Sequence, residues 1–264
     1  MPASPQIPNG QAEHTVADLI EAGRSLHHAG RLEDAERLYA QALAEDADCA
    51  EAHELLAVLA GQRGQFEAAV AGFRRAVALA GLTPQRCYNL AEAHRLAGDF
   101  RSAVAAYNQA LALDAGFFDA YRDCADAAKD EAAKARALGE NEAAARFDKL
   151  AAHYRKGLAL ALFRAERQAE TAAAYREAIS LDPENADLHH MLGVELDNQR
   201  LLPEAEAAFR RAIELDPGVP GYLNNLGVVL AREGRNDEAA ELFRRALAID
   251  PEFEDAQKNL SDLK

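Results

Sequence analysis

The chain repeats itself every 34 residues, and this period constrains its fold more than any other feature. The same residue types return one period later: Leu192, Gly193, Ala205, Phe209, Ala212 and Pro217 recur as Leu226, Gly227, Ala239, Phe243, Ala246 and Pro251. Earlier periods carry an aromatic residue at Tyr175, Tyr107, Phe73 and Tyr39, with Ala three residues later. Seven repeats therefore tile residues 16–253. Such a period indicates an array in which each repeat buries its apolar stripe only against its neighbours.

Each repeat is predicted to contain two helices. Its second half places Ala, an aromatic residue and Ala at i, i+4 and i+7, which is one stripe of a helix. Glycines occur where a left-handed residue would end the first helix, at Gly30, Gly64, Gly98 and Gly234. Asp-Pro pairs end later repeats, because the residue before proline avoids the α region. Alternating Val, Ile and Thr runs, the usual strand signal, are missing, so the fold class is all-α.

This pattern resembles the tetratricopeptide repeat, a helix–turn–helix unit of the same length. The resemblance implies a right-handed α-solenoid of about seven helix–turn–helix repeats with a C-terminal capping helix. We place the repeats at 16–49, 50–83, 84–117, 118–151, 152–185, 186–219 and 220–253, and the capping helix at 254–264. Residues 1–15, which are polar and contain three prolines, are expected to be disordered.

The fourth repeat, 118–151, departs most from the pattern. Neither Pro nor Gly interrupts residues 140–156, and the apolar stripe continues through them. We therefore expect the second helix of this repeat and the first helix of the next to be one long helix. It should run from about Glu142 to Phe163, after a turn at Gly139.

Charge and cysteine usage narrow the classes of partner. The formal net charge is −15, from 44 acidic and 29 basic residues, so nucleic acid and anionic membrane surfaces are not expected partners. No stretch approaches the roughly 18 apolar residues of a spanning helix. Three widely spaced cysteines and an N-terminus without a signal-peptide pattern favour a reduced, cytoplasmic protein.

No catalytic motif is present, so we expect neither an enzyme nor a bound cofactor. The adjacent pairs His27-His28 and His189-His190 are the only suggestion of a metal site. Neighbouring residues on a helix point about 100° apart and cannot chelate one ion together. No metal site is therefore predicted.

The resemblance places a ligand groove on the first helices of the repeats. Their ninth positions form an apolar strip of Leu160, Val194 and Val228, with Phe163 beside it. Side-chain amides lie next to the strip and resemble part of the asparagine ladder in the superhelix of O-linked N-acetylglucosamine transferase. An amide both donates and accepts, so it can bind peptide backbone of any sequence, although an ordinary polar helix residue is an equal alternative. The predicted peptide-binding residues are Leu160, Phe163, His190, Val194, Asn224, Asn225 and Val228.

Two secondary candidates lie elsewhere. Asn89 has the same repeat position as Asn225, and Asp119, Asp123 and Asp126 share one acidic helix face. This face would either receive a basic segment or simply be solvated. The family's carboxylate clamp for chaperone tails needs Lys and Asn at the fifth and ninth first-helix positions, and no repeat here has both.

These observations favour a non-catalytic scaffold that holds a peptide segment of a partner protein. One alternative is an accessory subunit that recognises substrates for an enzyme such as a glycosyltransferase. Another is self-assembly into a homo-oligomer.

Overall fold

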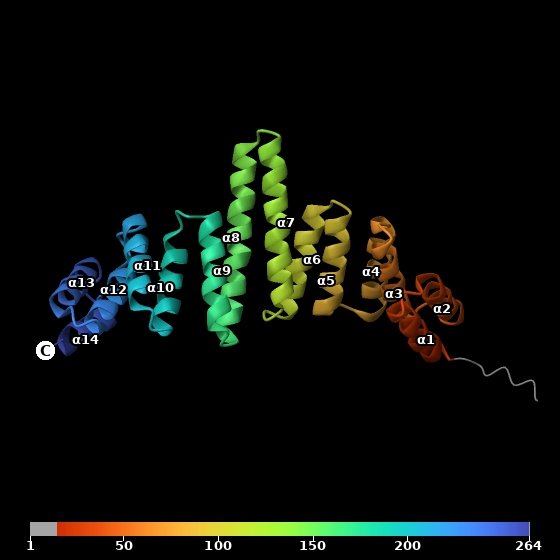
Figure 1. The fold of residues 1–264 in the computed structure, drawn as a ribbon, viewed down its shortest axis with the longest axis horizontal. Helices are drawn as coiled ribbons and strands as arrows, with labels where there is room; N and C mark the ends of the chain where they lie inside the picture. Colours follow the sequence, from red (N-terminus) through yellow and green to blue (C-terminus); the bar gives the residue numbers. More distant parts are fainter. Residues whose placement is uncertain (1–14, 264) are drawn as a thin grey trace, which may run out of the picture. The chain divides into compact units, whose positions relative to one another are not determined.

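The computed structural model describes residues 15–263, and helices make up almost all of that range (Figure 1). No strand occurs among the described residues, so the predicted all-α fold is confirmed. The disorder expected for residues 1–15 concerns residues outside the described range, apart from Thr15. Thr15 caps the first helix through reciprocal hydrogen bonds with Asp18. The chain forms two compact units, one ending at Leu113 and one beginning at Asp114.

The first unit contains three helical hairpins, each within one 34-residue period. Its helices are α1 (Val16–His28), α2 (Leu32–Glu45), α3 (Ala50–Gln62), α4 (Phe66–Ala80), α5 (Pro84–Leu96) and α6 (Phe100–Leu113). Each hairpin packs on the next, α2 against α3 and α4 against α5. Gly30, Gly64 and Gly98 follow the first helices with φ of 75°, 73° and 79°, the left-handed conformation that the sequence predicted.

The second unit begins with three helices and continues with regular hairpins. Its helices are α7 (Phe118–Ala137), α8 (Asn141–Arg164), α9 (Gln168–Leu181), α10 (Ala186–Asn198), α11 (Leu202–Leu215), α12 (Pro220–Arg232), α13 (Asn236–Ile249) and α14 (Glu254–Asp262). One continuous hydrophobic core connects α8 to α14. The last helix, α14, packs on α13 where a capping helix was expected.

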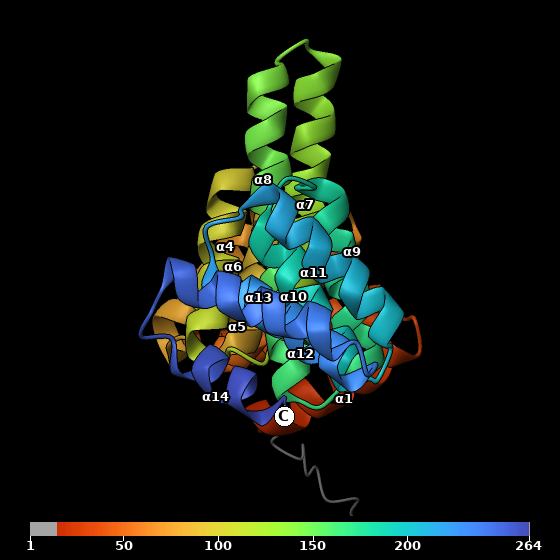
Figure 2. The ribbon, with the colours of Figure 1, turned by 90° about the vertical axis from the view of Figure 1, so that its left-hand side faces the viewer.

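The long helix predicted after residue 140 is confirmed as α8, which has 24 residues. The helix before it, α7, runs for 20 residues, and the turn between them contains Gly139 at φ 78°. The repeat boundary placed between residues 151 and 152 therefore falls inside α8. The tip of the α7–α8 hairpin projects past the end of α9 (Figures 1 and 2). Neither α7, α8 nor any other described helix combines the length and apolarity needed to cross a membrane.

The repeated aromatic residues form the centre of each hairpin. Their rings are buried at Tyr39, Phe73, Tyr107, Tyr175, Phe209 and Phe243. A small residue in the facing helix makes room for the ring. At Gly227, an added Cβ would lie 2.5 Å from Cε1 of Phe243, which is inside van der Waals contact. The Leu-Gly pair of the sequence thus serves close approach of the two helices in a hairpin.

Candidate functional site

The first helices of successive hairpins in the second unit are α8, α10, α12 and α14, and we call the surface they share the first-helix face. Side chains on this face contact one another at a separation of 35 residues, one more than the repeat period. Contacts at this spacing join α10 to α12 and α12 to α14. The predicted groove residues of the second unit all lie on these helices.

Three asparagines and one histidine on this face form a continuous series of hydrogen bonds, which we call the amide chain. Asn259 Nδ2 donates to Asn224 Oδ1 at 2.9 Å, and Asn224 Nδ2 donates to Asn225 Oδ1 at 3.3 Å. Asn225 Nδ2 then donates to His190 Nε2 at 2.9 Å. The amide chain therefore links α14, α12 and α10, and all of its bonds run in one direction.

His190 ends the amide chain as an acceptor. Its ring lies 4.7 Å from the ring of Tyr222 and 5.6 Å from the ring of Phe209, measured between centroids. Burial lowers the pKa of His190 below the ordinary histidine value, while the nearby Asp187 carboxylate opposes this shift. A neutral ring with an unprotonated Nε2 is the form that can accept the Asn225 hydrogen bond.

A second polar contact joins three of the first helices. Tyr222 Oη on α12 donates to Asp187 Oδ1 on α10 at 2.5 Å, and Lys156 Nζ on α8 lies 3.8 Å from Asp187 Oδ2. Burial and the hydrogen bond to the Asp187 carboxylate both raise the pKa of Tyr222. The phenol therefore stays protonated and fixes the side of the aromatic group on which His190 rests. Sequence reasoning missed Lys156, Asp187 and Tyr222, although a polar pair spaced one residue beyond the period was a signal for them.

Asn225 retains hydrogen-bonding capacity beyond the amide chain. Its amide uses one of two N–H groups and one of two oxygen lone pairs in the contacts above. The side chain is half-buried, whereas Asn224 is 5 % exposed. Asn225 can thus offer one donor and one acceptor to a ligand, held in a fixed orientation by His190.

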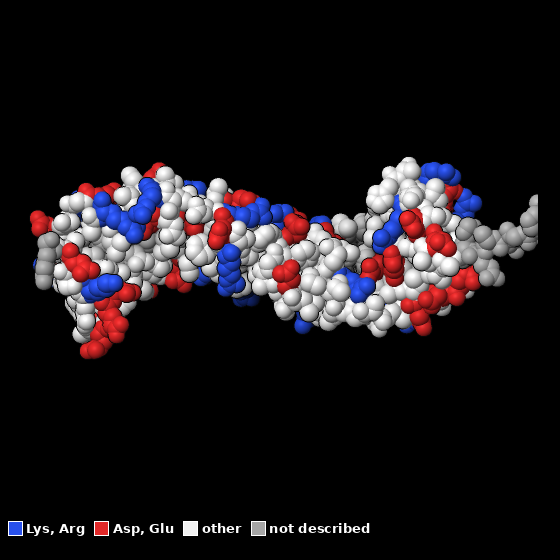
Figure 3. All heavy atoms as spheres, turned by 90° about the horizontal axis from the view of Figure 1, so that it is seen from below, with Lys and Arg blue, Asp and Glu red and all other residues white. Residues whose placement is uncertain are grey.

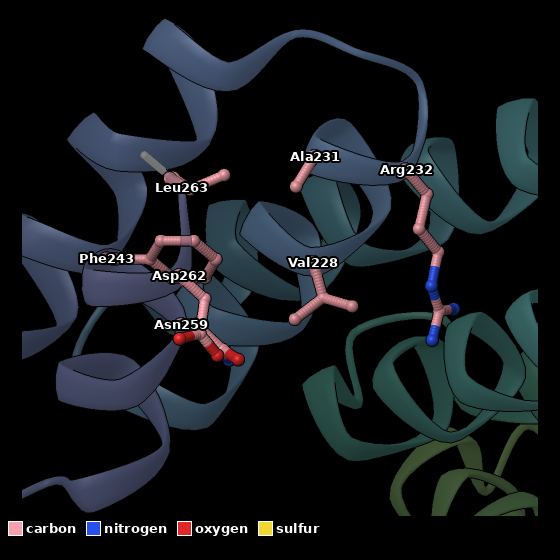
Figure 4. Close-up of a pocket in the computed structure, with 7 residues that line it drawn as sticks. All are labelled: Val228, Ala231, Arg232, Phe243, Asn259, Asp262 and Leu263. Atoms are coloured by element: carbon pink, nitrogen blue, oxygen red, sulfur yellow. The ribbon is translucent and has the colours of Figure 1, made fainter.

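The predicted apolar strip is present as separate exposed patches. Val194 and Val228 are half-buried and pack against the core, and Leu160 is half-buried on α8. Phe163, near the end of α8, is 48 % exposed. Val228 also lines a cavity of 280 Å³ between α12, α13 and α14 (Figure 4). The other residues that line it are Ala231, Arg232, Phe243, Asn259, Asp262 and Leu263.

The secondary candidates lie in different surroundings. Asn89 belongs to the first unit, where it accepts a 2.8 Å hydrogen bond from Gln85. On α7, the Asp119 carboxylate pairs with Arg122 at 2.8 Å, and the Asp126 carboxylate pairs with Arg155 at 2.5 Å. Asp123 lies between them and is half-buried. Much of the charge on this acidic face is thus compensated within the molecule.

Histidines and carboxylates do not gather into a metal site in the described part of the chain. No group of three or more His, Cys, Asp or Glu side chains there is placed to hold an ion. The adjacent histidines have separate roles, since His189 Nε2 contacts the Pro183 carbonyl oxygen at 2.9 Å while His190 ends the amide chain.

Comparison with known families decides the identity of the repeat. One family model described as tetratricopeptide repeat matches residues 20–85 and 190–252, and a second with the same description matches residues 84–117. Together the matches cover more than half of the chain. The chain belongs to the tetratricopeptide repeat family. Its tetratricopeptide repeats form the architecture of a protein-interaction scaffold, and the unmatched residues include the irregular helices α7–α9.

Several solved structures resemble this tetratricopeptide repeat chain. YrrB, described as a TPR protein with an unusual peptide-binding site, is 19 % identical, with TM-score 0.41 over 83 % of this chain and 96 % of YrrB. MamA from Desulfovibrio magneticus RS-1 is 19 % identical, with TM-score 0.38 over 77 % and 96 %. The first TPR of Spaghetti (RPAP3), bound to an HSP90 peptide, is 19 % identical, with TM-score 0.42 over 42 % and 89 %. A search of curated proteins gave no match. We rest the proposals below on this chain's own residues.

Proposed function

We propose that this protein is a non-catalytic scaffold that holds an extended peptide segment of a partner protein on the first-helix face of its second unit. The observation that carries this proposal is the amide chain, because it presents the half-buried Asn225 amide in one orientation. The segment would be bound mainly through its backbone, with apolar side chains resting on Val194 and Val228.

The chemistry of an amide suits this task. A peptide group has one N–H donor and one C=O acceptor, and the unused donor and acceptor of Asn225 match that pair. Such recognition does not depend on the side chains of the ligand. Selectivity must therefore come from the apolar contacts beside the amide.

A displayed library of random short peptides provides the test. We expect the purified full chain to enrich a set of peptides. The double variant Val194→Asp/Asn225→Ala should retain none of them while keeping its helical circular dichroism. Both changes are on the first-helix face, so the loss would locate binding there.

A matched control makes the same chemical changes away from this face. Ile249→Asp/Asn236→Ala alters exposed positions of α13 and should retain the peptides like the unaltered chain. Equal retention by both double variants would contradict the proposal. Light scattering on the peptide-free chain distinguishes a foreign segment from a second copy of the protein as the occupant, since only the latter raises the mass.

A further inference from the structure

Two cavities, one in each unit, are lined by the same repeat positions. The cavity of 330 Å³ in the first unit and that of 280 Å³ in the second share seven positions, each five repeat periods apart. The pairs are Val58 and Val228, Gly61 and Ala231, Gln62 and Arg232, Phe73 and Phe243, Asn89 and Asn259, Glu92 and Asp262, and Ala93 and Leu263. The cavity is therefore a product of the repeat itself, and arises where particular residues occupy it.

Small and polar residues in the following first helix leave the space open. Both cavities have Asn followed three residues later by an acid, Asn89 with Glu92 and Asn259 with Asp262. Residues at this spacing lie on one helix face. Elsewhere in the array the Asn position holds a large apolar side chain, such as Met191, which packs against the core. An Asn with an acid at i+3 is thus the local sequence pattern of an open cavity.

The two cavities differ in how their acid is compensated. In the first unit, the Glu92 carboxylate pairs with Arg95 at 2.6 Å and also accepts a hydrogen bond from Tyr107 Oη. In the second unit, the Asp262 carboxylate accepts only a 3.4 Å hydrogen bond from Ser261 among the described residues. Arg232, the cation at this cavity, is already paired with Asp197.

Further uncompensated charge surrounds the second cavity. Within the described range, Glu252, Glu254 and Asp255 form no ion pair, and all three are exposed. Figure 3 shows acidic side chains gathered at the end of the second unit that carries α12–α14. A cationic group that approaches the cavity would meet a negative field with no competing internal partner.

We propose, on the basis of the scaffold function above, that the second-unit cavity receives one large apolar side chain of the bound segment, next to a basic residue. The apolar side chain would lie against Val228 and the Phe243 ring, which form one side of the cavity (Figure 4). The basic residue would pair with Asp262. Asn259, which uses one N–H for the amide chain, has its oxygen and second N–H left for the backbone between them. The partner class is therefore a segment that combines an apolar anchor with Lys or Arg.

The test reads the composition of peptides enriched from a random displayed library by the full chain and by variants. The unaltered chain should enrich Leu, Met or Phe adjacent to Arg or Lys. Ala231→Leu fills the cavity and should abolish the preference for a large apolar residue. Asp262→Asn keeps the cavity but should lower the affinity of a selected basic peptide at least about tenfold in low salt.

Gly61→Leu is the matched control, because it fills the corresponding first-unit cavity, where the nearest atom to an added Cβ is 3.9 Å away. It should leave the apolar–basic preference unchanged. Asp262 is exposed at the end of α14, so its variant keeps the test valid even if Ala231→Leu unfolds.

Two outcomes would overturn the inference in distinguishable ways. If enriched peptides lack the apolar–basic pair and bind both variants equally, but are lost on Val194→Asp/Asn225→Ala, the cavity assignment fails and the scaffold function stands. If the unaltered chain enriches no peptide, the scaffold function fails and the inference fails with it.

Discussion

The side-chain amide of Asn225 on α12 donates a 2.9 Å hydrogen bond to Nε2 of His190 on α10. An amide nitrogen can only donate, so the ring nitrogen it meets must be unprotonated. Protonation of His190 would replace this attraction by two facing N–H groups and release Asn225 from its fixed orientation. The candidate site and the stability of the second unit are therefore both coupled to the charge of one histidine.

The first prediction concerns pH. Burial holds the folded-state pKa of His190 below its unfolded value of about 6.5, so the unfolded chain binds more protons between the two values. The contribution of His190 to stability is therefore complete above about pH 6.5, and is lost as pH falls through the folded pKa. Urea unfolding at about pH 7.5 and about pH 5 should show a larger loss for the unaltered chain than for His190→Gln. His94, whose pKa is also lowered by burial, remains in both proteins and cancels. The same loss in both proteins would contradict the assignment.

The second prediction concerns the close approach of helices in a hairpin. A Cβ at Gly227 would lie 2.5 Å from Cε1 of Phe243, whose ring is 1 % exposed and has no free space to enter. Gly227→Ala should therefore cost about 1–3 kcal/mol of unfolding free energy, the usual range for overpacking a core. Gly221→Ala, in the first turn of the same helix, meets no atom within 4 Å and should be neutral or stabilising. Urea midpoints that fall equally for both variants would rule out the ring contact as the cause.

The third prediction concerns the continuity of α8. Ala151 is buried in the middle of this 24-residue helix, at the position where the regular period would separate two repeats. Ala151→Pro removes a backbone hydrogen bond there and should cost about 3 kcal/mol or more. Proline is tolerated in the first turn of a helix, so Glu142→Pro should change the thermal midpoint little. If Ala151→Pro were the milder change, the helix would be interrupted near residue 151.

The fold could be predicted largely from the sequence because its determinants are local and periodic. Aromatic and small residues at one period identify the hairpins, and glycines at the turns identify the ends of first helices. Even the departure from the period was readable, since the absence of Pro and Gly around residue 151 predicts α8.

The candidate site was less predictable because its contacts depend on side-chain directions between helices. The sequence places Asn224 and Asn225 on α12, but the period alone does not say that one meets Asn259 and the other meets His190. The acidic face of α7 shows the same limit. Asp126 was read as available charge, yet Arg155, from a helix 29 residues away in sequence, reaches across to pair with it.

A buried carboxyl also escaped the pattern. Glu195 occupies a position that is apolar in most repeats, and it is 1 % exposed. One of its oxygens accepts a 2.8 Å hydrogen bond from Gln199, while the other has no partner among the described residues. Together with burial, its charge raises the pKa of Tyr175 to about 12. Because a burial pattern assigns this position to the core, only the coordinates show a polar group there.

The final prediction separates a residue that binds the ligand from one that positions it. Asn225→Ala removes the amide proposed to contact the peptide backbone, so a peptide enriched by the unaltered chain should bind about tenfold more weakly. His190→Phe keeps a ring against Tyr222 but removes the acceptor that orients Asn225, and its effect should be smaller. In the double variant, His190→Phe should add nothing to the loss caused by Asn225→Ala, because it acts only through that amide. Fluorescence anisotropy with the labelled peptide measures all four proteins, and fully additive effects would mean that His190 contacts the peptide on its own account.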